Sequence, residues 1–275
     1  MSKQAAQGRT VRDPDGDVEQ ARPSPPPGRA GAPGAAGALR WGAMLVYLDQ
    51  NYASRVAKYL RRQPGHAAFG QAYRALEEAA PLVPPSPFHV LETRGGYLLP
   101  TLRTVFARFS RGWWVRPYQD VVRRQAVRDG EVAHDDLLTR HGDWSVPATL
   151  DPLDDLLDLP LEGDATARRR AVRHVVAARF ALREGRAEQM PFVRLLARMV
   201  AFRTLDDERA PRPSDLTDLV MAATVAPYVD VLATDRYVRE TLQRVGYRTP
   251  TFSGRRPDVL RFARWLRAAA TAASE

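Results

Sequence analysis

The segment Leu45-Val46-Tyr47-Leu48-Asp49-Gln50-Asn51 decides the fold, because four apolar residues run directly into an aspartate. A short apolar run bounded by polar residues is typical of a buried strand. An amphipathic stretch over 52–60 follows at once, so the pattern is a strand, an acidic turn and a helix. Ligands of α/β sheets bind beyond the carboxyl ends of the strands, which would place Asp49 at the mouth of a site. Taken alone, Asp49 is equally well explained as the N-cap of the helix.

The last third of the chain repeats this pattern. A buried strand is predicted over 228–234 and ends in Asp235, and a helix follows over 236–245. Ser214 is placed to cap another helix, which begins at Asp215. We therefore expect an α/β fold.

The rest of the chain is predicted to be mostly helical. Apolar residues at helical spacing predict helices over 51–62, 66–80, 98–109, 118–127, 164–183, 191–205 and 257–270, a shorter one after Ser86, and an edge strand over 247–252. We interpret about 120–205 as a helical insertion in a domain spanning 44–255, and 256–275 as a C-terminal helix that packs on it. Residues 1–43 are rich in Pro, Gly and Ala and are expected to be a disordered tail, with Met44 as the biological start.

Composition limits the classes of function. The 275 residues include no cysteine, which excludes disulfides and thiolate zinc sites and is compatible with the cytoplasm, where we expect the protein. No apolar stretch is long enough to span a membrane, and the N-terminus does not resemble a signal peptide. The net charge of +9 favours an anionic partner such as nucleic acid, although GC-rich coding alone also enriches arginine.

Acidic residues recur at comparable places along the chain: Asp49, Glu92, the pair Asp215 and Asp218, and Asp235. Carboxylates that gather in one place repel one another and raise each other's pKa unless a cation compensates. An all-oxygen ligand set suits Mg²⁺ or Mn²⁺, and such ions activate water and stabilise the leaving oxygen of a phosphodiester. Each acid taken singly is also explained as part of a solvated helix face.

Three segments carry a resemblance to a known family: VYLDQNYAS at 46–54, PSPFHVLET at 85–93 and PSDLTDLVMAATVAPYVDVLATDR at 213–236. They resemble the PIN-like domain nucleases, whose pattern is a strand-end Asp, a Glu on a following helix, an Asp heading a helix and an Asp after the next strand. The resemblance covers roughly 44–118 and 206–255.

The resemblance implies a PIN-like three-layer α/β fold, with a central parallel sheet flanked by helices. It also implies cleavage of RNA by metal-activated water, with Mg²⁺ or Mn²⁺ as cofactor. It implies catalytic and metal-binding roles for Asp49, Glu92, Asp218 and Asp235, and metal binding by the additional acids Asp215 and Asp230. Some members of the family are toxins, so an antitoxin protein is a possible partner beside RNA. A non-catalytic module that binds nucleic acid or a protein partner through a PIN-like fold is the alternative.

Two further features leave their alternatives open. Phosphatases with an aspartyl nucleophile also begin with a strand-end Asp, but they require a second Asp where this chain has Asn51. The basic helix over 164–183 is predicted to contact RNA through Arg169, Arg170 and Arg173. The same helix is also explained as a solvated face whose arginines pair with Glu184 and Glu188.

Overall fold

A computed structural model describes residues 44–93, 96–128, 132–206, 212 and 214–274. Residues 35–275 belong to one compact unit, and the following description concerns the described part of it. The tail expected over 1–43 lies outside the described residues. Met44, the expected biological start, is the first residue that the structure describes.

A small parallel sheet organises the unit. Its strands lie in the order β1-β4-β5, with β1 at Val46–Leu48, β4 at Val231–Thr234 and β5 at Thr251–Ser253. On the side of β1 away from β4, Leu45 forms an isolated parallel bridge with Leu82. Parallel strands place all their carboxyl ends at one edge, so the residues that follow β1 and β4 share that edge.

Side chains of β1 and β4 alternate between two hydrophobic clusters. Val46 and Leu48 face one cluster, built mainly with α1 (Gln50–Leu60), α2 (Ala67–Ala79), α4 (Leu99–Ser110) and α12 (Arg256–Ser274). Tyr47 and Leu232 face the other. Because both faces of the strands are buried, these strands consist of continuous apolar residues rather than an alternating pattern.

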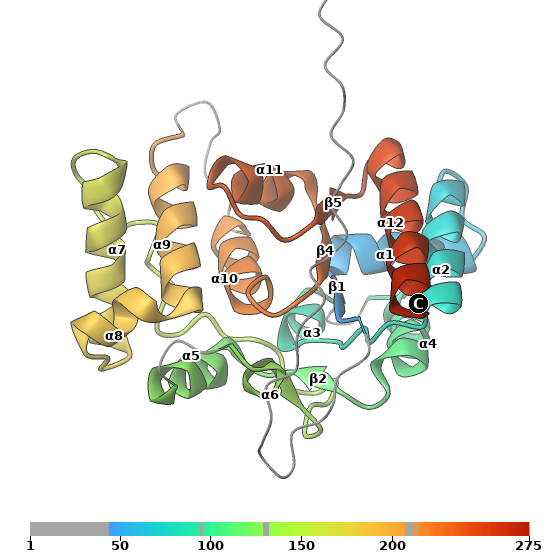
Figure 1. Cartoon of the computed structure of the whole chain (residues 1–275), viewed down its shortest axis with the longest axis horizontal. Coiled ribbons are helices and arrows are strands. Elements are labelled where there is room, and N and C mark those ends of the chain that lie inside the picture. Colours follow the sequence, from blue (N-terminus) through green and yellow to red (C-terminus); the bar gives the residue numbers. More distant parts are fainter. Residues whose placement is uncertain (1–43, 94–95, 129–131, 207–211, 213, 275) are drawn as a thin grey trace, which may run out of the picture. The chain divides into compact units, whose positions relative to one another are not determined.

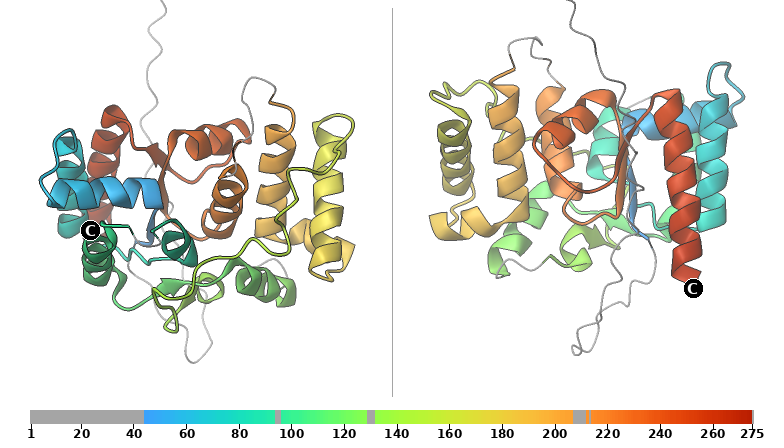
Figure 2. Two further views of the ribbon diagram at one scale, coloured as in Figure 1. Left: turned by 180° about the vertical axis from the view of Figure 1, so that it is seen from behind. Right: turned by 45° about the horizontal axis from the view of Figure 1, so that its top comes forward.

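The second cluster extends through most of the remaining helices. These are α3 (Pro87–Thr93), α5 (Tyr118–Val127), α6 (His134–Leu137), α7 (Ala165–Arg179), α8 (Glu184–Gln189), α9 (Pro191–Arg203), α10 (Asp215–Val225) and α11 (Arg236–Arg244). Figure 1 shows α2 and α12 on one side of the sheet and α10, α9 and α7 in succession on the other, and the two views of Figure 2 show the same order. The structure is therefore α/β, with a small parallel sheet between layers of helices.

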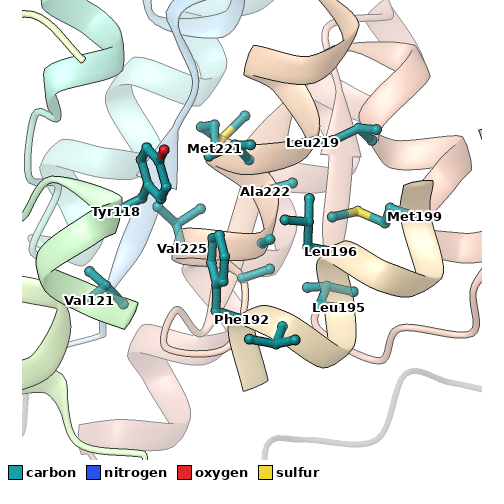
Figure 3. Packing of buried hydrophobic residues seen from close by; sticks show 14 of the residues in the cluster. Tyr118, Val121, Phe192, Leu195, Leu196, Met199, Leu219, Met221, Ala222 and Val225 are labelled. Atoms are coloured by element: carbon teal, nitrogen blue, oxygen red, sulfur yellow. The ribbon is translucent and has the colours of Figure 1, made fainter. Parts of the chain in front are cut away.

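The predicted insertion shares its core with the sheet. Phe192, Leu196 and Met199 of α9 are buried against Ala222 and Val225 of α10, as Figure 3 shows. Helix α7 packs in turn on the outer face of α9. The cluster that contains these helices also contains Tyr47 of β1, so the insertion adds to the central core rather than forming a separate cap.

Several element boundaries differ from the sequence-based prediction. The strand predicted over 228–234 begins only at Val231, and the edge strand predicted over 247–252 is Thr251–Ser253. A short strand, β2 (Trp114–Val115), pairs with β3 (Leu138–Thr139) in a separate antiparallel pair. Among the described residues, no helix is long and apolar enough to cross a membrane.

Candidate acidic site

Two aspartates follow directly after the two central strands. Asp49 comes after β1 and caps α1, and Asp235 comes after β4 and caps α11. Asp235 accepts a hydrogen bond from the backbone N–H of Val238 at 2.8 Å. Because β1 and β4 are adjacent and parallel, the two aspartates lie side by side at the carboxyl edge of the sheet. Capping and site formation are therefore compatible roles of the same side chains.

The carboxylate of Asp49 is held by donors on α1 and at the end of β4. Its Oδ1 accepts from the backbone N–H of Tyr52 at 2.9 Å, and its Oδ2 accepts from the backbone N–H of Asp235 at 2.9 Å and from the hydroxyl of Thr234. Burial raises the pKa of Asp49 to about 6, against the opposing effect of these hydrogen bonds; the charge of Asp235 raises it further. Asp49 is thus fixed in place while retaining an unfavourable charge.

Glu92 reaches the same edge from α3. Its side chain is exposed within the cleft and makes no hydrogen bond or ion pair with the described part of the chain. Partial removal from water raises its pKa to about 7, and the negative charges of Asp49 and Asp235 contribute to the rise. Glu92 is therefore close enough to both aspartates for their negative charges to raise its pKa.

A buried histidine links α3 to the end of β1. The Nδ1 atom of His89 accepts from the backbone N–H of Ser86 at 2.9 Å, so its Nε2–H donates to the carbonyl oxygen of Leu48 at 2.7 Å. The hydroxyl of Ser86 joins this ring to the hydroxyl of Tyr47, with both contacts at 2.7 Å. His89 is fully buried, and burial lowers its pKa to about 4, so the neutral ring is retained.

This network was not apparent from the sequence, in which His89 is only a residue one turn before Glu92. In the structure it ties the helix that carries Glu92 to the residue that immediately precedes Asp49. A Ser-x-x-His pattern at the start of a helix beside a strand-end Asp was the available signal, and it is too common to identify such a contact alone.

Asp218 comes from the first turn of α10. Its pKa is raised to about 8, first by partial burial and then by the charges of Asp235, Glu92 and Asp49, with Asp215 adding a smaller effect. The negative charges of Asp49, Glu92 and Asp235 thus all raise the pKa of Asp218. Carboxylates from distant parts of the sequence therefore lie near one another at this edge of the sheet.

A cleft of about 1150 Å³ contains these side chains, and we call it the acidic cleft. Glu92, Asp218 and Asp235 line it, while Asp49 lies just beneath, next to Thr234. Four arginines also line its walls: Arg55, Arg212, Arg236 and Arg255. A negative centre with positive walls is suited to a ligand that brings both a cation and a phosphate group.

The carboxylates of the acidic cleft are suitable ligands for a hard divalent ion, but in their present positions their side chains are not close enough together to bind one. All four side chains offer carboxylate oxygens, the ligands that Mg²⁺ and Mn²⁺ prefer. As they stand, however, no three acidic or histidine side chains of the described residues are close enough to hold a metal ion. Glu92 is exposed and has no partner to prevent its rotation, so it is the side chain best able to complete a ligand set.

Two of the predicted metal ligands have other roles. Asp215 is fully buried in α10, where its Oδ2 accepts from Nε of Arg203 at 3.0 Å and from the backbone N–H of Arg212 at 3.1 Å; it does not line the acidic cleft. A buried carboxylate needs such a cation, and Arg203 supplies it. The expectation that Asp215 binds metal is therefore not met by its position.

Asp230 lies at the opposite edge of the sheet. It immediately precedes β4, and its Oδ2 accepts from the backbone N–H of Leu45 at 2.7 Å. The length of β4 separates it from Asp235 by roughly 16 Å along the strand. Asp230 therefore cannot join the other acids, and it stabilises the amino edge of the sheet instead.

The arginines predicted to bind RNA lie on α7, separated from the sheet by α9 and α10 (Figure 1). Arg173 pairs with Glu188 at 3.3 Å, and Arg169 bonds to the carbonyl oxygen of Ala165 and the hydroxyl of Thr166. Arg170 is exposed. None of the three lines the acidic cleft, so any contact with nucleic acid is a contact remote from the carboxylates.

Comparisons with protein-family models, with curated proteins and with solved structures find no match to this chain. The function of the acidic cleft is therefore inferred from its chemistry and geometry.

Proposed function

We propose that this protein is a divalent-metal-dependent nuclease of the PIN-like type, and specifically an endoribonuclease. The observation that carries the proposal is the convergence of Asp49, Glu92, Asp218 and Asp235 at the carboxyl edge of the sheet. Three of these carboxylates have raised pKa values, at about 6, 7 and 8, in part because they repel one another. Groups perturbed in this way in a cleft are typical of functional sites.

The ion is held, in this proposal, by Asp49, Glu92, Asp218 and Asp235, with Mg²⁺ or Mn²⁺ as the candidates. When bound, it supplies charge neutralisation and activation of water for hydrolysis of a phosphodiester. The chain itself orients the acids: Thr234 and the backbone fix Asp49, and the helix held by His89 presents Glu92. The exposed guanidinium groups of Arg212 and Arg255 at the cleft walls are positioned to attract the phosphate backbone.

The raised pKa values couple metal binding to proton release near neutral pH. At pH 7 and without an ion, the carboxyl of Glu92, with a pKa of about 7, is divided between its protonated and ionised forms. A carboxyl group ligates a metal ion in its ionised form, so binding of the ion would displace this proton.

The test is cleavage of a fluorogenic RNA in the presence of Mg²⁺ or Mn²⁺ by Glu92→Gln and Asp49→Asn variants. We expect each variant to lose at least about a hundredfold in rate, since even partners of metal ligands contribute 10- to 100-fold. Asp230→Asn is the matched control, because it makes the same chemical change on the other edge of the sheet and its amide oxygen still accepts from Leu45. Equal rates in Glu92→Gln and in Asp230→Asn would refute the assignment.

The alternative function is a nucleic-acid-binding module that does not cleave. One observation favours it: among the described residues, the acids do not already form a closed set of three metal ligands. Isothermal calorimetry with Mg²⁺ and Mn²⁺ separates the two functions. A protein that binds RNA, takes up neither ion and leaves RNA intact is a binding module.

A further inference from the structure

A second hollow lies between α7 and α9, on the part of the chain that the proposed function leaves without a role. Its volume is about 220 Å³. We call it the arginine hollow, and its lining consists of Thr166, Arg169, Arg173, Arg194, Ala197 and Arg198. The four arginines form two i,i+4 pairs, one on each helix, and residues at this spacing lie on the same helix face.

Little negative charge in the described structure offsets these arginines. Arg173 pairs with Glu188, and the contact that Arg198 makes among the described residues is with the carbonyl oxygen of Val245. Within the described residues, the guanidinium group of the exposed Arg194 has neither a hydrogen bond nor an ion pair. Asp164 is a nearby acid, but its carboxylate already accepts from two backbone N–H groups as the N-cap of α7.

One buried donor also lacks an acceptor. The Nε–H group of Arg173 is buried and makes no hydrogen bond within the described structure. An unsatisfied buried donor is unfavourable, and Arg173, which carries it, is one of the residues that line the hollow. The hollow therefore combines excess positive charge, unused guanidinium donors and a cavity of the size of a small anion.

We propose that the arginine hollow binds the phosphodiester backbone of a nucleic-acid strand. Guanidinium groups bind phosphate oxygens through paired, charge-assisted hydrogen bonds, and phosphate is the anion for which clustered arginines are best suited. The proposal rests on the proposed function in taking nucleic acid as the ligand, but it requires no cleavage.

The hollow is placed to hold a strand at a distance from the acidic cleft. Arg198 bonds to Val245, which ends α11, whereas Asp235 in the acidic cleft begins the same helix. Helix α11 has 9 residues, so its length of roughly 14 Å separates the two places. The hollow is therefore a second contact point apart from the acidic cleft, and contacts to phosphates fix the position of a strand without reading its bases.

The experiment compares Arg169→Ala/Arg194→Ala with Arg124→Ala/Arg183→Ala in the full chain. Both variants lose two positive charges from the helical insertion, but Arg124 and Arg183 do not line the arginine hollow and are exposed without hydrogen bonds or ion pairs among the described residues. Fluorescence anisotropy measures binding of labelled uridine oligonucleotides, ribo- and deoxyribo-, of about twelve nucleotides. EDTA is present throughout, so metal-dependent cleavage does not interfere.

Two lost phosphate contacts reduce the slope of log affinity against log salt by about 1.4 for a single strand. Between 50 and 200 mM salt, the advantage of the wild type over the lining variant then shrinks about sevenfold. We expect the control variant to retain a slope close to that of the wild type. Thermal unfolding followed by circular dichroism verifies that both variants are folded.

The outcomes distinguish this proposal from the nuclease proposal. Equal slopes in the two variants, or a lining variant that binds like the wild type, overturn the arginine hollow even if the wild type cleaves RNA. A lining variant with the reduced slope supports the hollow even if no cleavage is found. Similar losses for the ribo- and deoxyribo-oligonucleotides indicate recognition of the shared backbone, and a loss confined to RNA indicates a contact with the 2′-hydroxyl.

Discussion

Replacing Asp218 with Asn is expected to stabilise the protein at pH 8 in the absence of divalent ions. The pKa of Asp218 is raised from 3.8 to about 8 in the folded state, chiefly by burial and then by the charges of Asp235, Glu92 and Asp49. The folded protein therefore keeps a proton on Asp218 over a pH range in which the unfolded chain has released it. The free energy of unfolding must then fall as pH rises from about 4 to about 8.

The size of the effect follows from the shift. Each pKa unit corresponds to 1.36 kcal/mol, so the full shift sets an upper limit of about 5 to 6 kcal/mol. Asp218 is only partly buried, and the cleft is open to water, so screening reduces this to about 1 to 2 kcal/mol. For a chain of this size, such a gain raises the melting temperature by about 2 to 8 °C.

The assay is thermal unfolding of the wild type and of Asp218→Asn in EDTA, at intervals from pH 4 to pH 9. The difference in melting temperature should be near zero at pH 4, grow through neutral pH and level off above pH 8. Asp158→Asn is the control, because Asp158 is exposed and lies outside the acidic cleft. A difference that does not change with pH, or the same difference in the control, would refute the electrostatic description of the cleft.

Three other predictions address the site and its support. Thr234→Val removes a hydrogen bond that lowers the pKa of Asp49, so a carbon-13 NMR titration should place that pKa above its present value of about 6; an unchanged or lower value would contradict the contact. Arg203→Met leaves the carboxylate of Asp215 buried without its cation, so urea unfolding should show a loss of about 3 to 5 kcal/mol, whereas a loss under 1 kcal/mol would show that the pair is dispensable. Binding of Mg²⁺ at pH 7 should release about one to two protons from the acidic cleft, because carboxyls with pKa values of about 6, 7 and 8 must ionise to ligate; calorimetry in buffers of different ionisation enthalpy measures this number, and zero protons would exclude these ligands.

The sequence was sufficient to predict the elements that bring the acids together. Continuous apolar runs that end in Asp49 and Asp235 identified the two central strands, because both faces of those strands are buried. The strand predicted over 228–234, however, begins in the structure only at Val231, three residues later than predicted. Asp230 precedes this strand and therefore lies at the wrong edge for the site. Strand boundaries depend on long-range pairing that local pattern does not contain.

Long-range partners account for the other differences. The spacing of Asp215 and Asp218 places them on one helix face. Only the structure reveals that Arg203 of α9 forms an ion pair with Asp215. Likewise, the predicted RNA-binding set on α7 was chosen from one helix, whereas the arginine hollow also includes Arg194 of α9. Sequence spacing describes neighbours within a helix, and contacts between helices require the fold.

The pairing of β1 with β4 has a consequence for how the chain folds. Val46 lies opposite Val231, so the sheet that separates the two clusters joins segments near the two ends of the described chain. Contacts between residues far apart in sequence slow folding, since a long loop must close before they form. During synthesis, neither cluster can close until β4 has left the ribosome, and the cluster that contains α1 and α2 also requires α12. The apolar faces of α1 and α2 therefore stay exposed for most of translation. The protein should therefore fold late and slowly, and chains interrupted after α9 should aggregate or require a chaperone.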